Sequence, residues 1–107
     1  MRFEIVLAPQ AARDFRALPA RHRSEVRDAM EAHLRHEPTK VSKSRIERLR
    51  RMARPQYRLR VGDTRVFYDV RDETVEVLAI VAKRQAQSWL AERGTPEPDG
   101  GSGEGEG

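Results

Sequence analysis

Apolar and polar residues alternate between residues 57 and 82, which is the pattern of strands that bury one face. The pattern predicts strands over residues 56–61, 64–71 and 74–82, with two-residue turns at Gly62-Asp63 and Asp72-Glu73. Antiparallel pairing across these turns gives one face the side chains of Tyr57, Leu59, Val61, Val66, Tyr68, Val70, Val75, Val77, Ala79 and Val81. We expect this face to be the core.

Helical spacing dominates the first third of the chain, after a short predicted strand over residues 2–7. Pro9 suits the first turn of a helix, and further apolar residues follow at helical spacing until Pro19. A second helix is predicted over residues 21–36. Residues 44–52 fit either a short basic helix or an irregular arm, and residues 85–92 fit a last short helix.

The element order is therefore β-α-α-β-β-β-α, which indicates an α+β fold. We expect a helical hairpin packed on one face of a small, mainly antiparallel sheet, followed by a short C-terminal helix. Residues 1–93 form this domain. Residues 94–107 are rich in Gly, Pro and acidic residues that cannot build a core, so they are predicted to be a disordered tail.

Charge is distributed unevenly along the 107 residues. All 21 Lys and Arg residues lie within residues 1–93, together with 13 of the 17 acidic residues, which gives this part a net charge of +8. Residues 40–65 contain ten basic residues and only two acidic ones, Glu47 and Asp63. Such a concentration favours a polyanion as partner, with nucleic acid the commonest, although a solvated basic surface has the same composition.

The second face of the predicted sheet carries most of the remaining charge. It consists of Arg58, Arg60, Arg65, Phe67, Asp69, Glu76, Leu78, Ile80 and, if the alternation continues, Arg84. Arg60 falls directly opposite Arg65, an arrangement of like charges that destabilises a sheet. An anion between the guanidinium groups would remove this cost, because arginine binds phosphate as a planar fork. The alternative is a solvated face that happens to carry arginines.

Groups that move protons are scarce near these arginines. His22, His33 and His36 lie in or near the second helix, and Tyr57 and Tyr68 fall on the core face. Trp89, the only tryptophan, either packs over Phe67, Leu78 or Ile80 or offers a surface for base stacking. No cluster of acidic residues and histidines has the spacing of a metal site, and no nucleotide motif is present, so no metal and no cofactor are expected.

The absence of cysteine excludes disulfides and thiolate metal sites and is typical of a reducing compartment. No apolar run approaches the ~20 residues that a membrane-spanning helix needs, and no signal peptide is recognisable. We therefore expect a cytoplasmic protein without a membrane partner.

The run "YRLRVGDTRVFYDV" followed by "VEVLAIVAKR", after a strand and a helical hairpin, resembles the RelE/ParE superfamily of bacterial toxins. The resemblance covers about residues 1–90. It implies a small α+β toxin that is neutralised by an antitoxin encoded beside it. RelE-like members cut messenger RNA on the ribosome without a metal, the 2′-hydroxyl attacking the neighbouring phosphate while basic residues of the sheet act on the RNA.

The resemblance also implies roles for single residues. Arg65 and Arg84 would stabilise the scissile phosphate, and Arg58 and Arg60, which stand where RelE-like toxins have lysines, would bind phosphate or orient the 2′-hydroxyl. The residues expected to bind the RNA backbone or bases are Lys43, Arg45, Arg48, Arg51, Lys83 and Trp89. No residue matches the family's proton-transfer pair, and Leu90 stands where several RelE-like enzymes have a tyrosine.

The favoured hypothesis is thus a ribosome-dependent, metal-independent mRNA endonuclease whose partners are a cognate antitoxin, the ribosome and mRNA. One alternative is a ParE-like inhibitor of DNA gyrase, which acts by binding and needs no ribonuclease residues. Another is a weakly active protein of the same fold that serves an antitoxin or co-repressor as partner.

Overall fold

The computed structural model describes residues 1–98 and has three helices and a five-stranded sheet within that range. The elements, in chain order, are β1 (Glu4–Leu7), α1 (Pro9–Ala17), α2 (Ala20–Leu34), β2 (Ile46–Arg48), β3 (Met52–Arg54), β4 (Tyr57–Val61), β5 (Thr64–Arg71), β6 (Thr74–Ala82), α3 (Lys83–Arg93) and β7 (Thr95–Pro96). The expected α+β class is confirmed. The expected order lacked β2, β3 and β7.

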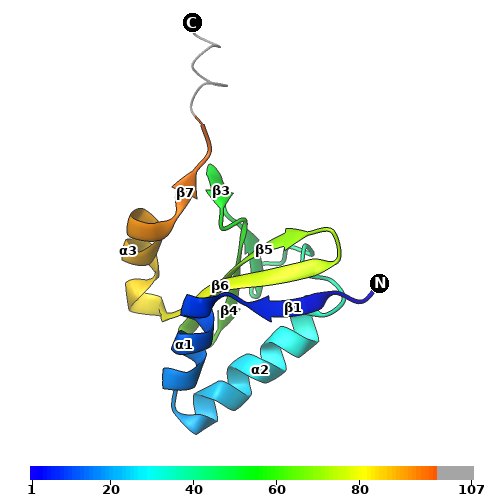
Figure 1. Cartoon of the computed structure of the whole chain (residues 1–107), viewed down its shortest axis with the longest axis vertical. Helices are drawn as coiled ribbons and strands as arrows, with labels where there is room; N and C mark the ends of the chain where they lie inside the picture. The colour runs from blue at the N-terminus through cyan, green and yellow to red at the C-terminus, as the bar shows by residue number, and fades with distance from the viewer. Residues whose placement is uncertain (99–107) are drawn as a thin grey trace, which may run out of the picture.

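The main sheet has the strand order β1-β6-β5-β4-β2, and only the β1–β6 pair is parallel. The helices α1 and α2 lie together on one side of it, whereas α3 and the small β3–β7 sheet lie elsewhere around it (Figure 1). The main core lies between the helical hairpin and the sheet. Its buried residues are Ala11, Val26, Met30, Leu34, Ile46, Leu59, Val61, Val66, Tyr68, Val75, Val77 and Ile80.

Both predicted turns are confirmed. Gly62 has a φ of 56° and Asp72 a φ of 53°, left-handed conformations that Gly and Asp adopt most readily at tight hairpin turns. The register of β4 on β5 is the one expected, with Arg58 opposite Phe67, Leu59 opposite Val66 and Arg60 opposite Arg65.

The expected register of β6 fails beyond the middle of the strand. Val75 and Val77 pair with Val70 and Tyr68 as predicted, but Phe67 pairs with Ala79, so Leu78 is an extra residue that forms a bulge. The bulge reverses the alternation. Ile80 therefore joins the main core opposite Val66 instead of the arginine face, and Val81 lies opposite Arg65 instead of in the core.

A carboxylate of α1 satisfies the backbone beyond this bulge. The side chain of Asp14 accepts the amide proton of Ile80 at 2.9 Å, in the part of β6 that extends past the end of β1. Gln10 donates to the same carboxylate at 3.3 Å and accepts the indole N–H of Trp89 at 3.5 Å. The first helix thus fixes both the last strand and the last helix.

The segment over residues 44–52 is neither a helix nor wholly irregular. It contains β2, which pairs antiparallel with β4, and it leads into β3. Thr95-Pro96 then pair with β3, so the first residues of the predicted tail are strand residues. Gly94 makes this connection possible, because an added Cβ would lie 2.5 Å from the Met52 side chain and 2.7 Å from the Leu90 carbonyl oxygen. The rest of that prediction, for residues 99–107, lies outside the described residues.

Candidate nucleic-acid interface

The face of the sheet opposite the helical hairpin carries arginines at one end. Arg60 and Arg65 face each other on β4 and β5, and Arg58 lies two residues along β4 on the same side. Arg60 is exposed, whereas Arg65 is only 5% exposed. The three predicted residues of the hairpin therefore form one group of guanidinium ions.

Arg65 is held by its own turn. Its guanidinium donates to the carbonyl oxygens of Gly62 at 2.8 Å and Thr64 at 3.0 Å. Burial lowers the pKa of Arg65, and the charges of Arg60 and Arg58 lower it further, whereas the carboxylate of Asp63 raises it. The charge of Arg65 is therefore disfavoured by its burial first and by the neighbouring guanidinium groups second.

Arg58 has a partner that the sequence did not reveal. Glu47 stands directly opposite it on β2, and the two side chains form an ion pair. The prediction of the residues on this face therefore missed Glu47. It failed because residues 44–52 were assigned to a helix or an arm, and only a strand at this position directs Glu47 to the arginine face.

A hollow of about 100 Å³ opens beside this ion pair. Its lining contains four cations and one carboxylate and consists of Val41, Ser42, Lys43, Arg45, Glu47, Arg58 and Arg60. Arg45 is hydrogen-bonded to β4, since the amide of Arg60 donates to the Arg45 carbonyl oxygen at 2.9 Å. The structure thus brings Lys43 and Arg45 together with Arg58 and Arg60. We call this set the basic hollow.

The remaining predicted binding residues lie elsewhere. Arg48 covers the ring of Tyr57 at 5.4 Å and donates to two backbone carbonyls, so its guanidinium has internal partners. Arg51, with a φ of 61°, forms the turn before β3. Lys83 and Arg84 begin α3 and line a separate hollow of about 360 Å³ with Asp63 and Ala82.

The alternation that placed Arg84 beside the other arginines does not reach it, because the bulge reverses the face and α3 begins at Lys83. A backbone bond nevertheless ties this end of α3 to the hairpin, with the amide of Lys83 donating to the Asp63 carbonyl at 2.7 Å. Asp63 is therefore the residue shared by the turn that holds Arg65 and the hollow that Arg84 lines.

Trp89 is partly buried and packs against the sheet. Its ring stacks on Phe67 with the centroids 4.8 Å apart and the planes 15° from parallel. These two rings belong to a second small core with Leu49 and Ala86. Of the two predicted roles for Trp89, packing over Phe67 is therefore the one seen.

The hydroxyl group of Tyr68 is not available for chemistry at this face. Tyr68 is fully buried on the helix side and donates to the carbonyl of Pro38 at 2.6 Å. Burial raises the pKa of Tyr68 far above its usual value of 10.0. Among residues 1–98, no group of three or more His, Asp or Glu side chains is arranged to hold a metal ion.

A family model for the ParE toxin of type II toxin–antitoxin systems, parDE, matches residues 5–87. The chain belongs to this family. It is a toxin of the RelE/ParE superfamily, as the resemblance implied, and thus the toxin of a toxin–antitoxin module. Comparison with the sequences of curated proteins gives no significant match.

Solved structures agree with this membership. The toxin–antitoxin complex RelBE2 from Mycobacterium tuberculosis contains a chain that is 26% identical, with a TM-score of 0.66, over 77% of this chain and 99% of that one. The RelE-RelB complex from Pyrococcus horikoshii gives 24% identity and a TM-score of 0.64 over 78% and 97% of the two chains. A mutant of the E. coli toxin RelE in the free state gives 21% and 0.64 over 86% and 94%. At these identities, the last two likenesses concern the fold. No helix among the described residues is long and apolar enough to cross a membrane.

Proposed function

We propose that this toxin is a ribosome-dependent endonuclease that binds messenger RNA at the basic hollow and cuts it without a metal. The observation that carries the proposal is the position of Glu47, a carboxylate surrounded by Lys43, Arg45, Arg58 and Arg60 in one hollow. Cations at this site bind the phosphodiester backbone, and the carboxylate supplies the proton acceptor that the arginines cannot provide.

The reaction consistent with this site is an attack of the 2′-hydroxyl oxygen on the adjacent phosphorus. Glu47 accepts the hydroxyl proton, the new oxygen–phosphorus bond closes a cyclic phosphate, and the bond to the 5′ oxygen breaks. Lys43, the one ammonium group that lines the hollow, is the candidate donor of a proton to the leaving oxygen. Arg60 and Arg65 stabilise the charge that develops on the phosphate oxygens.

Because Glu47 forms an ion pair with Arg58, substrate binding affects whether Glu47 is free to act as a base. A phosphate that binds Arg58 competes with the carboxylate for the same guanidinium. Glu47 is thereby released as a base only when RNA is present. The exposed location of the pair makes the exchange inexpensive, because surface ion pairs contribute only about 0–1 kcal/mol.

A second function is supported by the family match itself, since the matching model is that of the ParE toxin. In this alternative the chain inhibits DNA gyrase by binding, and the arginines contact protein or DNA. It requires no proton transfer, which agrees with a face whose cations, apart from Lys43, are all arginines. Under both functions the partner that neutralises the toxin is an antitoxin, as in the complexes with similar chains.

Primer extension on ribosomes that carry a defined message distinguishes the two functions. We expect cleavage by the wild type and a loss of about 100-fold or more in Arg60→Gln, because the variant lacks a cation that stabilises the transition state. The matched control is Arg21→Gln, an exposed arginine of α2 outside the hollow. No cleavage by a folded wild type, together with cleaved DNA accumulating on purified gyrase, would establish the alternative.

A further inference from the structure

Most cations of the basic hollow have no carboxylate partner. Arg58 forms an ion pair with Glu47. Lys43, Arg45 and Arg60 are exposed, and none of them forms an ion pair within the described part of the chain. Like charges gathered in one hollow repel one another, and guanidinium groups bind anions strongly. The hollow is therefore a site for an anion even when no RNA is bound.

The chain supplies such an anion in its own C-terminal segment, residues 97–107. This segment contains four acidic residues and no basic one, whereas residues 1–93 carry a net charge of +8. Its last two acidic residues, Glu104 and Glu106, alternate with glycine in the run Gly-Glu-Gly-Glu-Gly. In an extended chain, side chains two residues apart point to the same side about 6.5 Å apart. The two carboxylates would then present regularly spaced negative charges, as successive phosphates of a nucleic-acid strand do.

The structure fixes the point at which this segment starts. Strand β7 pairs with β3, and the amide of Glu97 donates to the carbonyl oxygen of Arg51 at 2.9 Å. Arg45 lies six residues before Arg51, so their Cα atoms are at most about 21 Å apart. Glu106 lies nine residues after Glu97, a stretch that spans up to about 30 Å when extended. The acidic end of the segment can therefore reach the basic hollow without any change in the described fold.

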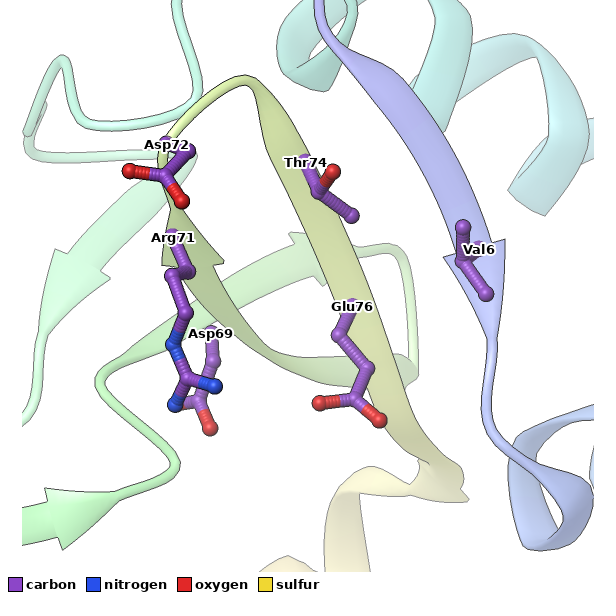
Figure 2. A pocket seen from close by; sticks show the side chains of 6 residues that line it. All are labelled: Val6, Asp69, Arg71, Asp72, Thr74 and Glu76. Atoms are coloured by element: carbon purple, nitrogen blue, oxygen red, sulfur yellow. The ribbon is translucent and has the colours of Figure 1, made fainter.

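A second hollow near β3 repels the same segment. It has a volume of about 320 Å³ and is lined by Val6, Asp69, Arg71, Asp72, Thr74 and Glu76 (Figure 2). Three carboxylates and one guanidinium thus face this space. Arg54 of β3 already bridges Asp69 and Glu76, at 3.6 Å and 3.3 Å. Further carboxylates would raise the repulsion here, so this hollow is a poor site for the segment.

The hollow at the start of α3 is the nearest competitor. It is lined by two cations, Lys83 and Arg84, and one carboxylate, Asp63, whereas the basic hollow has four cations and one carboxylate. Helix α3 contains eleven residues, so Lys83 lies about 15 Å from its C-terminal end, where the segment begins. Both hollows are within reach, and the basic hollow attracts the segment more strongly because it holds more uncompensated positive charge.

We propose that the C-terminal segment docks in the basic hollow through Glu104 and Glu106 and competes there with RNA. The docking follows from the charge and the geometry of the hollow, and the competition rests on the proposed function. Because the segment belongs to the same chain, its effective concentration at the hollow is in the millimolar range, so weak contacts are sufficient. RNA that binds through few phosphates is then excluded, whereas RNA held by further contacts, as on a ribosome, displaces the segment.

Carbodiimide cross-linking of amines to carboxylates, performed on the full chain, tests the docking. Lys43 and Lys83 are both exposed, and trypsin releases residues 94–107 as one peptide because no Lys or Arg follows Arg93. This peptide is expected to be joined to Lys43 at least about tenfold more often than to Lys83, since docking raises its local concentration at one hollow only. Equal yields at the two lysines overturn the proposal. Products that join two copies of the chain also overturn it, in favour of contacts between copies.

RNA titrations test the competition. The triple variant Asp99→Asn, Glu104→Gln, Glu106→Gln is expected to bind single-stranded RNA about tenfold more tightly than the wild type at low salt, and the difference should shrink as salt rises. The matched control removes the same charge from exposed positions elsewhere, by Glu25→Gln, Asp28→Asn and Glu73→Gln.

Equal gains in the two triple variants overturn the competition, because net charge alone would then explain them. A cross-link at Lys43 in a protein that binds no RNA supports the docking and refutes the proposed function, so the two failures are distinguishable.

Discussion

Arg60 and Arg65 stand directly opposite each other across β4 and β5, and neither forms an ion pair with a carboxylate within residues 1–98. One is exposed and the other is almost completely buried. The two guanidinium groups therefore repel each other at the centre of the basic surface, and this repulsion destabilises the hairpin. An anion that binds between the two side chains would remove this cost, which relates the stability of the hairpin directly to ligand binding.

The Arg60→Gln variant should separate stability from binding. Removal of one of two facing like charges is expected to raise the free energy of unfolding by about 0.2–1 kcal/mol. The same change should weaken RNA binding. The salt dependence of the RNA affinity should then correspond to about one phosphate contact fewer. Denaturant unfolding and RNA titrations at several salt concentrations check both effects. A less stable variant would contradict the idea that the pair is strained.

Glu47→Gln should affect binding and cleavage in opposite directions. The variant frees Arg58 from its ion pair, so RNA affinity is expected to rise. Loss of the proton acceptor should reduce cleavage by about 100-fold or more. Glu37→Gln, which breaks an exposed ion pair with Lys40, is the control and should change neither quantity. Equal cleavage by Glu47→Gln and wild type would exclude Glu47 as the base.

The contribution of Asp69 to the stability of the domain should fall as pH rises above the ordinary pKa of aspartate. Burial raises the pKa of Asp69 above 3.8, although the Gln56 amide and Arg54 oppose the shift. The folded state therefore holds this proton more tightly than the unfolded state, and the resulting stabilisation is complete below about pH 3.8 and is lost as pH rises through the folded-state pKa.

The Asp69→Asn variant isolates this contribution, because its amide oxygen can still accept the Gln56 amide proton. Its stability should lack the part of the pH dependence that begins near 3.8. Thermal unfolding of both proteins between pH 3 and 7 provides the comparison. Parallel curves for the two proteins would mean that Asp69 ionises as freely as in an unfolded chain.

Trp89→Ala should destabilise the domain without changing RNA affinity. The substitution removes the ring that stacks on Phe67 and opens the second small core, at an expected cost of about 3 kcal/mol. Because this ring packs on Phe67, a folded variant should bind RNA as the wild type does. Weaker binding at temperatures where the variant remains folded would instead assign Trp89 a base-stacking role.

The hairpin and its arginines could be predicted because local signals determine them. Gly62-Asp63 specifies the turn, and once the turn is known, the alternation of Leu59, Val61 and Val66 assigns each side chain to a face. Glu47 could not be placed in this way. The spacing of Ile46, Leu49 and Met52 fits a helix, and β2 exists only because it pairs with β4.

The bulge in β6 escaped prediction for a different reason. Residues 77–82 are all apolar, so no polar residue reveals which side chains point to which face. The bond that stabilises the new register joins Asp14 to Ile80, residues 66 positions apart in the chain. The residues around Asp14 in the sequence give no indication that its carboxylate bonds to the backbone of β6.

The extra residue at Leu78 has a consequence for comparing this toxin with its relatives. In a strand without this extra residue the alternation from Val77 onward is unbroken. The third and fourth residues after Val77 would then face the arginine side and the helix side, the reverse of Ile80 and Val81 here. An ungapped alignment with a relative of shorter β6 would thus equate inward residues with outward ones. The percentage of sequence identity would not reveal the mismatch. Homology arguments about the start of α3, Arg84 included, are secure only after the residues between Val77 and Ala82 have been counted.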